Sequence, residues 1–222
     1  MIGEKLHSIL EELPHSVKLV AVSKFHPMED ILEAYNAGQR RFGENRPQEF
    51  AAKAVQLPQD IEWHFIGHLQ TNKLKLVLPY ASLVQSIDSR HLLDAVSQWA
   101  ENNGKVIRVL LELHLGSEDT KSGMDAEEIL DICREAAQYP RIRFCGLMGM
   151  ASNTDDEARI REEFSRIRSL FRRISEEFPQ LTDFRELSIG MSGDWKIAVD
   201  CGATIVRIGT AIFGYRDYPN TL

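Results

Sequence analysis

The sequence predicts an α/β protein that folds as a single parallel barrel of eight strand and helix pairs. Its 222 residues are enough for one large core, and barrels of this kind exceed 200 residues as single units. Short apolar runs alternate along the chain with longer segments of helical period. No Pro-rich or Gly/Ser-rich linker interrupts this alternation, so we expect residues 1–222 to form one (β/α)8 TIM barrel domain.

Eight runs rich in Val, Ile, Leu and Phe are the predicted strands. Their nearly continuous apolar character is typical of strands that are buried on both faces of a parallel sheet. They cover residues 18–23, 41–44, 63–67, 83–87, 106–113, 143–148, 186–190 and 205–208.

Helix signals lie between these runs. Pro27 opens one predicted helix and Gly38 ends it, while Gly104 closes the apolar stripe that begins at Leu92. Asp125 and Glu128 resemble a capping box ahead of another helix. The arginine-rich stretch 159–173 also contains an apolar stripe and offsetting glutamates, which favours an outer barrel helix over a basic binding surface.

Composition excludes several classes of function. The net charge of -7 gives no overall field that attracts nucleic acid, and no apolar run is long enough to span a membrane. Three cysteines without a C-x-x-C pair argue against a disulfide scaffold and a structural zinc site. The first residues lead into an amphipathic stretch rather than a signal peptide. We therefore expect a cytoplasmic protein with no metal site and no nucleic-acid or membrane partner.

In a parallel barrel, catalytic and ligand-binding groups lie at the carboxyl ends of the strands. Lys24 and Asn45 follow the first two predicted strands, and His64 lies in the third. An amine near low-dielectric walls disfavours the ammonium form, so Lys24 could form a Schiff base. The alternative is a solvated surface lysine. His64 could line the site, although a histidine in an apolar strand is more often a hydrogen-bonded core residue.

The turns after the last two strands contain what a phosphate group needs. Small residues let backbone N–H groups approach closely at Gly190 and Gly209, and Ser192 and Thr210 add hydroxyl donors. The alternative is that these glycines only form tight turns. Arg207 would complete a site for pyridoxal phosphate, because a permanently charged donor keeps the ring nitrogen unprotonated. The alternative for Arg207 is that it forms an ordinary ion pair at the end of the barrel.

Several long motifs carry a family resemblance from about Lys18 to Tyr215. They are AVSK at 21–24, FGENRPQE at 42–49, WHFIGHLQTNK at 63–73, KSG at 121–123, GLMGM at 146–150, LSIGMSGD at 187–194 and VRIGTAIFG at 206–214. With these motifs the sequence resembles the YggS-like (PROSC) pyridoxal phosphate homeostasis family, whose barrel is like the amino-terminal domain of alanine racemase.

This resemblance implies pyridoxal 5'-phosphate as cofactor, held as an internal aldimine on Lys24. It further implies that Arg207 faces the pyridine nitrogen and that Met191 and Asn45 line the pocket. The phosphate contacts implied are Ser192, Gly209 and Thr210. The sequence departs from the family at Ile189, where methionine is usual, and at His114, where asparagine is common. Asn72 and Lys73 could contact a substrate or cap a helix.

The expected function is a carrier that binds pyridoxal phosphate in intracellular vitamin B6 homeostasis, without robust enzymatic turnover. Candidate recipients are apo-enzymes that depend on this cofactor, and we expect a monomer. One alternative is a weak amino-acid racemase, which needs a second acid/base group across the cofactor plane. Alanine racemase takes that group from an additional β-domain. We do not expect such a domain here, because the predicted barrel uses the sequence up to Leu222. Another alternative is a Schiff-base aldolase that uses the same lysine without a cofactor.

Overall fold

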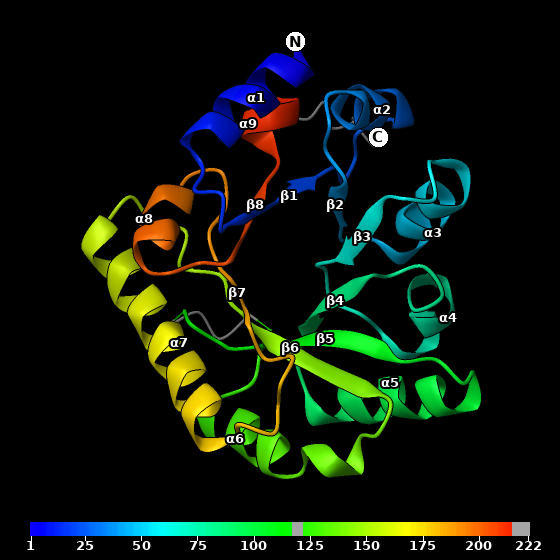
Figure 1. The fold of residues 1–222 in the computed structure, drawn as a ribbon, viewed down its shortest axis with the longest axis vertical. Helices are drawn as coiled ribbons and strands as arrows, with labels where there is room; N and C mark the ends of the chain where they lie inside the picture. The colour runs from blue at the N-terminus through cyan, green and yellow to red at the C-terminus, as the bar shows by residue number, and fades with distance from the viewer. Residues whose placement is uncertain (117–121, 215–222) are drawn as a thin grey trace, which may run out of the picture.

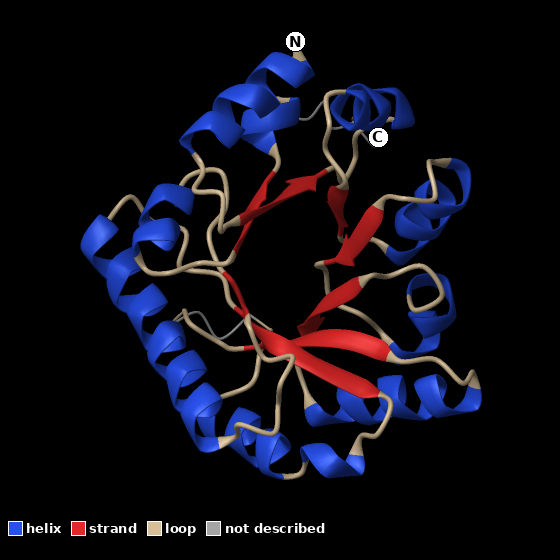
Figure 2. Ribbon diagram, viewed as in Figure 1, coloured by secondary structure: helices blue, strands red, loops and turns tan. Residues whose placement is uncertain are grey.

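The computed structural model describes residues 1–116 and 122–214, and their strands close into an all-parallel barrel in chain order. Figures 1 and 2 show the ring of strands with the helices outside it. The strands are β1 (Lys18–Val22), β2 (Arg41–Glu44), β3 (Glu62–Phe65), β4 (Leu83–Ile87), β5 (Ile107–Glu112), β6 (Ile142–Met148), β7 (Glu186–Ser188) and β8 (Ile205–Ile208). The predicted barrel is confirmed, and each predicted run overlaps one strand.

Helices follow the strands and cover the outside of the barrel. They are α1 (Ile2–Glu12), α2 (Met28–Asn36), α3 (Pro47–Gln56), α4 (Leu74–Val77), α5 (Arg90–Asn102), α6 (Ala126–Arg134), α7 (Glu157–Glu177), α8 (Trp195–Asp200) and α9 (Thr210–Phe213), with short 3-10 helices η1 (Thr71–Lys73) and η2 (Ala136–Gln138). Helix α1 packs beside α2 and α9, near the junction of β1 and β8 where the barrel closes.

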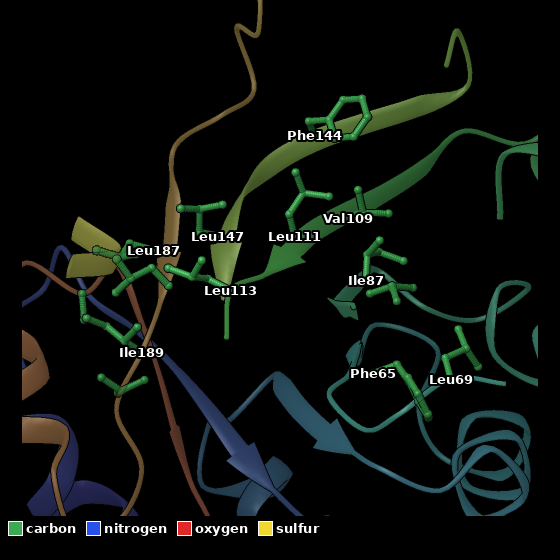
Figure 3. Packing of buried hydrophobic residues seen from close by; sticks show 14 of the residues in the cluster. Phe65, Leu69, Ile87, Val109, Leu111, Leu113, Phe144, Leu147, Leu187 and Ile189 are labelled. Atoms are coloured by element: carbon green, nitrogen blue, oxygen red, sulfur yellow. The ribbon is translucent and has the colours of Figure 1, made fainter. Parts of the chain in front are cut away.

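Alternate side chains of each strand point to opposite faces, so the barrel has two apolar regions. The larger lies between the strands and the helices, and Figure 3 shows Phe65, Val109, Leu111, Leu147 and Leu187 in it. The smaller cluster contains inward-facing residues, namely Val20, Leu83, Leu110, Cys145, Met148 and Ile205. Both regions exclude water, which leaves polar chemistry to the two ends of the barrel and to a few inner positions.

The helix ends agree with the sequence in most respects. Gly38 and Gly104 adopt positive φ angles of 103° and 61°, as the ends of α2 and α5 require. Asp125 caps α6 by accepting a hydrogen bond from the Glu128 N–H at 2.8 Å. The reciprocal half of the predicted capping box is wrong, because the Glu128 carboxylate accepts from the Arg90 N–H at 3.3 Å instead.

The arginine-rich stretch forms most of α7, an outer helix, as predicted. Ile160, Phe164, Ile167 and Ile174 are buried along one face of it, while arginines on the exposed face pair with glutamates of the same helix. All three cysteines are buried and free, which agrees with their interpretation as small core residues. Among the described residues, no helix combines the length and apolar character that crossing a membrane requires.

Candidate functional site

A cavity of about 410 Å³ opens at the carboxyl ends of the strands. It brings together seven of the eight residues that the sequence singled out: Lys24, Asn45, Met191, Ser192, Arg207, Gly209 and Thr210. The remaining lining residues are Val22, Ile66, Gly67, His68, Glu112, Ser122, Met150 and Gly193. Residues from both ends of the chain meet here because β1 pairs with β8, and that pairing places Lys24 near the turn at Gly209.

A buried cluster anchors the backbone on both sides of Lys24. The Lys53 amine on α3 donates to the Ser23 carbonyl at 2.9 Å and to carboxylate oxygens of Glu44 and Glu49 at 2.7 and 2.6 Å. The Glu49 carboxylate accepts from the Phe25 N–H at 2.7 Å, where the backbone has a φ of 67° that a bulky residue rarely adopts. The turn that contains Lys24 is therefore anchored to α3 by hydrogen bonds to the residues before and after it.

Glu44 is an unusual member of this cluster because one of its oxygens is buried and has no hydrogen-bond partner within residues 1–116 and 122–214. Its other oxygen accepts from the Ser23 hydroxyl at 2.6 Å and shares Lys53 with Glu49. Burial outweighs these favourable contacts and raises the pKa of Glu44 to about 7.

The turns after β7 and β8 are joined to each other. The Gly209 N–H donates to the Ser192 hydroxyl oxygen at 3.2 Å, and the Arg207 N–H donates to the Gly190 carbonyl at 3.0 Å. Gly190 has a φ of 93°, and a Cβ there would lie 2.5 Å from the Cβ of Ala198, so only glycine fits. Ser192 and Thr210, one from each turn, both line the cavity.

Arg207 forms part of the cavity floor and is only 3% exposed. Its guanidinium donates to the carbonyls of Ser188 and Gly149 at 2.8 and 3.0 Å, which fixes its plane. Burial lowers the pKa of Arg207 to about 10, although Glu112 and Asp194 favour its charged form. The group therefore stays a cation at neutral pH and remains a donor without any acceptor site.

The residues present fit a phosphate-bearing aromatic aldehyde. Among the described residues the Asn45 side-chain oxygen is buried without a partner, so it can accept a hydrogen bond from a ligand. A Cβ added to Gly193 would meet nothing within 4 Å, so the wall beside the hydroxyls is open. Gly67 lies against the Asn45 backbone so closely that a Cβ would stand 2.2 Å from its carbonyl oxygen. A primary amine, a fixed cation and two hydroxyls complete the donor set.

Several lining residues were not identified from the sequence. Glu112 is the last residue of β5 and accepts from the Ser122 hydroxyl at 2.8 Å, and burial raises its pKa. His68 is largely exposed and its Nδ1 lies 2.7 Å from the Asp88 carboxylate. An acidic residue at the end of the fifth strand was the available signal for Glu112, since strand ends line the site.

The structure does not bring His64 to this cavity. Its side chain points into the barrel nearer the opposite end and lines a second, smaller cavity with Lys18, Arg41 and Arg108. Its Nδ1 is bonded to the Gln85 amide at 2.7 Å, which fits the alternative of a hydrogen-bonded core residue. Asn72 and Lys73 lie in η1, and neither they nor His114 line the cavity.

Comparisons with known proteins agree with this geometry. The profile of the family described as "Alanine racemase, N-terminal domain" matches residues 2–217. The pyridoxal phosphate homeostasis protein of Pasteurella multocida is 41% identical, over 91% of this chain and 88% of the relative. That of Aquifex aeolicus is 37% identical, over 97% and 98%.

Solved structures show the same likeness. PipY of Synechococcus elongatus without PLP has a TM-score of 0.92 and 38% identity, and PipY with PLP bound has 0.89 and 37%. Each match covers 96% of this chain and all of the PipY chain. Alanine racemase from E. faecalis is 19% identical with a TM-score of 0.79, over 100% of this chain and 59% of the racemase chain. This more distant likeness shows the fold alone.

Proposed function

The chain belongs to the pyridoxal phosphate homeostasis protein family, and from this premise we propose that it binds pyridoxal 5'-phosphate covalently on Lys24. The observation that carries the proposal is the meeting of Lys24, Arg207 and the hydroxyls of Ser192 and Thr210 in one cavity. These groups match an aldehyde, a ring nitrogen and a phosphate respectively.

When bound, the cofactor supplies an aldehyde that condenses with a primary amine and an aromatic ring that can withdraw electrons. The amine of Lys24 is the attachment point, held by the turn that α3 anchors. Ser192, Gly209 and Thr210 bind the phosphate, while Arg207 donates toward the ring nitrogen. Asn45 and Met191 line the ring, and the buried Asn45 oxygen can accept a hydrogen bond from a hydroxyl substituent of the ring.

The biological role that we propose is to hold and release this cofactor in intracellular vitamin B6 homeostasis, with cofactor-dependent apo-enzymes as recipients. Relatives of this length carry the name of homeostasis proteins, which supports a carrier over a racemase. We further propose a cytoplasmic monomer without robust turnover. The weak racemase remains the second candidate, and its test is described in the Discussion.

Absorption spectroscopy with borohydride reduction tests the attachment. We expect purified protein to absorb in the visible range after incubation with pyridoxal phosphate, and Lys24→Ala to lack this band. Reduction followed by peptide mapping should place the added mass on Lys24. The matched control is Lys18→Ala, which removes a lysine from the other end of β1, where it pairs with Glu186. An unchanged band in Lys24→Ala, or a mass on another lysine, would refute the proposal.

A further inference from the structure

A line of hydrogen bonds crosses the barrel interior from the cavity floor toward the opposite end. The Arg207 guanidinium donates to the Ser188 hydroxyl at 2.7 Å, and that hydroxyl donates to the Gln85 Oε1 at 2.6 Å. The Gln85 Nε2 lies 2.7 Å from the His64 Nδ1. These residues come from β8, β7, β4 and β3, so the line joins strands on different sides of the barrel.

All four side chains are between 0% and 4% exposed, so water cannot replace their partners. They occupy inward positions of their strands, next to the apolar cluster that contains Leu83 and Ile205. A buried polar group without a partner costs far more than its hydrogen bond contributes. Ser188 and Gln85 therefore depend on their neighbours in the line, while Arg207 also donates to the carbonyls of Ser188 and Gly149.

The direction of every bond follows from the chemistry of Arg207. A guanidinium only donates, so the Ser188 oxygen accepts from it and the Ser188 proton is free to point at Gln85. The Gln85 oxygen accepts the hydrogen bond from the Ser188 hydroxyl, so its amide nitrogen faces His64 and donates. His64 must then accept at Nδ1 and carry its proton on Nε2, at the wall of the second cavity.

We propose that Gln85 is a positioning residue for Arg207. Gln85 holds the Ser188 hydroxyl in the orientation in which its oxygen accepts from the Arg207 guanidinium and helps to fix it. This role rests on the proposed function, because Arg207 faces a ring nitrogen only if pyridoxal phosphate binds. Gln85 itself does not line the cavity, so it acts through Ser188 and touches no ligand.

Three variants test this role. Gln85→Met keeps the length of the side chain and removes both hydrogen bonds. Gln85→Glu keeps an oxygen for the Ser188 hydroxyl whether or not the carboxyl is protonated. The control is Gln39→Met, which removes a glutamine that is also buried and donates to two backbone carbonyls at 2.9 and 2.6 Å. Gln39 therefore matches Gln85 in burial and in lost bonds, but it does not reach Arg207.

We expect Gln85→Met to raise the dissociation constant of pyridoxal phosphate about 2- to 10-fold, the worth of one hydrogen bond. It should also shift the pH midpoint of the visible band, because the Arg207 guanidinium then keeps its two carbonyl partners but no longer has a Ser188 hydroxyl oriented by Gln85. Gln85→Glu should return both quantities toward wild type, and Gln39→Met should leave them unchanged. Equal behaviour of Gln85→Met and Gln39→Met, or no recovery in Gln85→Glu, would overturn the role of Gln85.

A second measurement needs no cofactor. Nitrogen-15 NMR of the cofactor-free protein should show His64 protonated at Nε2 and unprotonated at Nδ1 near neutral pH. A proton on Nδ1 would mean that Gln85 does not donate there, which contradicts the direction of the line. If the wild type shows no visible band, the proposed function fails instead, while the NMR result still decides the hydrogen-bond direction.

Discussion

Two hydroxyls at neighbouring turns, those of Ser192 and Thr210, are the smallest groups on which cofactor affinity should depend. Both line the cavity, and Ser192 is fixed by the Gly209 N–H. We expect Ser192→Ala and Thr210→Ala each to weaken binding of pyridoxal phosphate by about 0.5 to 3 kcal/mol, the worth of a hydrogen bond to a charged group. Titration followed by the visible band measures both constants.

Ser169→Ala is a suitable control for these variants, because its hydroxyl bonds the Ser165 carbonyl on exposed α7. It should bind the cofactor as the wild type does. Normal affinity in both cavity variants would mean that the phosphate is held elsewhere.

At the scale of elements, α3 and the ends of β1 and β2 share one buried charge cluster. The folded pKa of Glu44 is about 7, above its ordinary value of 4.5, so the folded protein binds this proton more tightly than the unfolded chain does. Stability contributed by protonated Glu44 is therefore present at low pH and is lost as the pH rises from about 4.5 to about 7. The slope cannot exceed about 1.4 kcal/mol per pH unit for one group.

Denaturant unfolding of the cofactor-free protein at several pH values checks this expectation. As the pH rises from about 4.5 to about 7, the unfolding free energy of the wild type should fall relative to that of Glu44→Gln. Above this range the difference between the two proteins should no longer change. Glu62→Gln is the control, since Glu62 is an exposed carboxylate that pairs with Arg41 on the same sheet. A difference that is constant with pH would show that folding does not raise the pKa of Glu44.

At the scale of the whole molecule, the cavity is open to water on one side. Among the described residues that line it, His68 is 64% exposed at its side chain and Met191 is 39% exposed. Arg207 cannot give a proton to the ring nitrogen at neutral pH, which weakens electron withdrawal by the ring. We therefore expect that L-alanine exchanges its α-proton slowly in deuterated water and that D-alanine does not accumulate.

Proton NMR and chiral chromatography of the loaded protein measure exchange and inversion. Besides Lys24, the described lining offers two further bases, the buried Glu112 and the exposed His68, of which His68 pairs with Asp88 at the open side. His68→Ala should abolish any residual exchange, whereas His91→Ala, a change on the exposed face of α5, should not alter it. Rapid formation of D-alanine that requires Lys24 would support the racemase instead.

The sequence by itself determined the order of the elements and, together with the family resemblance, identified seven residues that line the cavity. Apolar runs such as 205–208 mark strands because both of their faces are buried, and Arg207 stands out in such a run because a charge there needs partners. The rule that ligands meet at the carboxyl ends of barrel strands then grouped Lys24 with residues far along the chain.

Only the tertiary structure decided where His64 and Glu112 lie and that Gln85 is linked to Arg207 through Ser188. A strand residue faces the inside or the outside of the barrel according to the register of pairing, and its height along the axis depends on the stagger of neighbouring strands. His64 precedes the last residue of β3 by one position, yet its hydrogen bond to Gln85 directs its side chain toward the second, smaller cavity. The His64–Gln85 contact spans 21 positions of the sequence, and the Gln85–Ser188 contact spans 103 positions. No local sequence pattern records these contacts, because they form only once the barrel has closed.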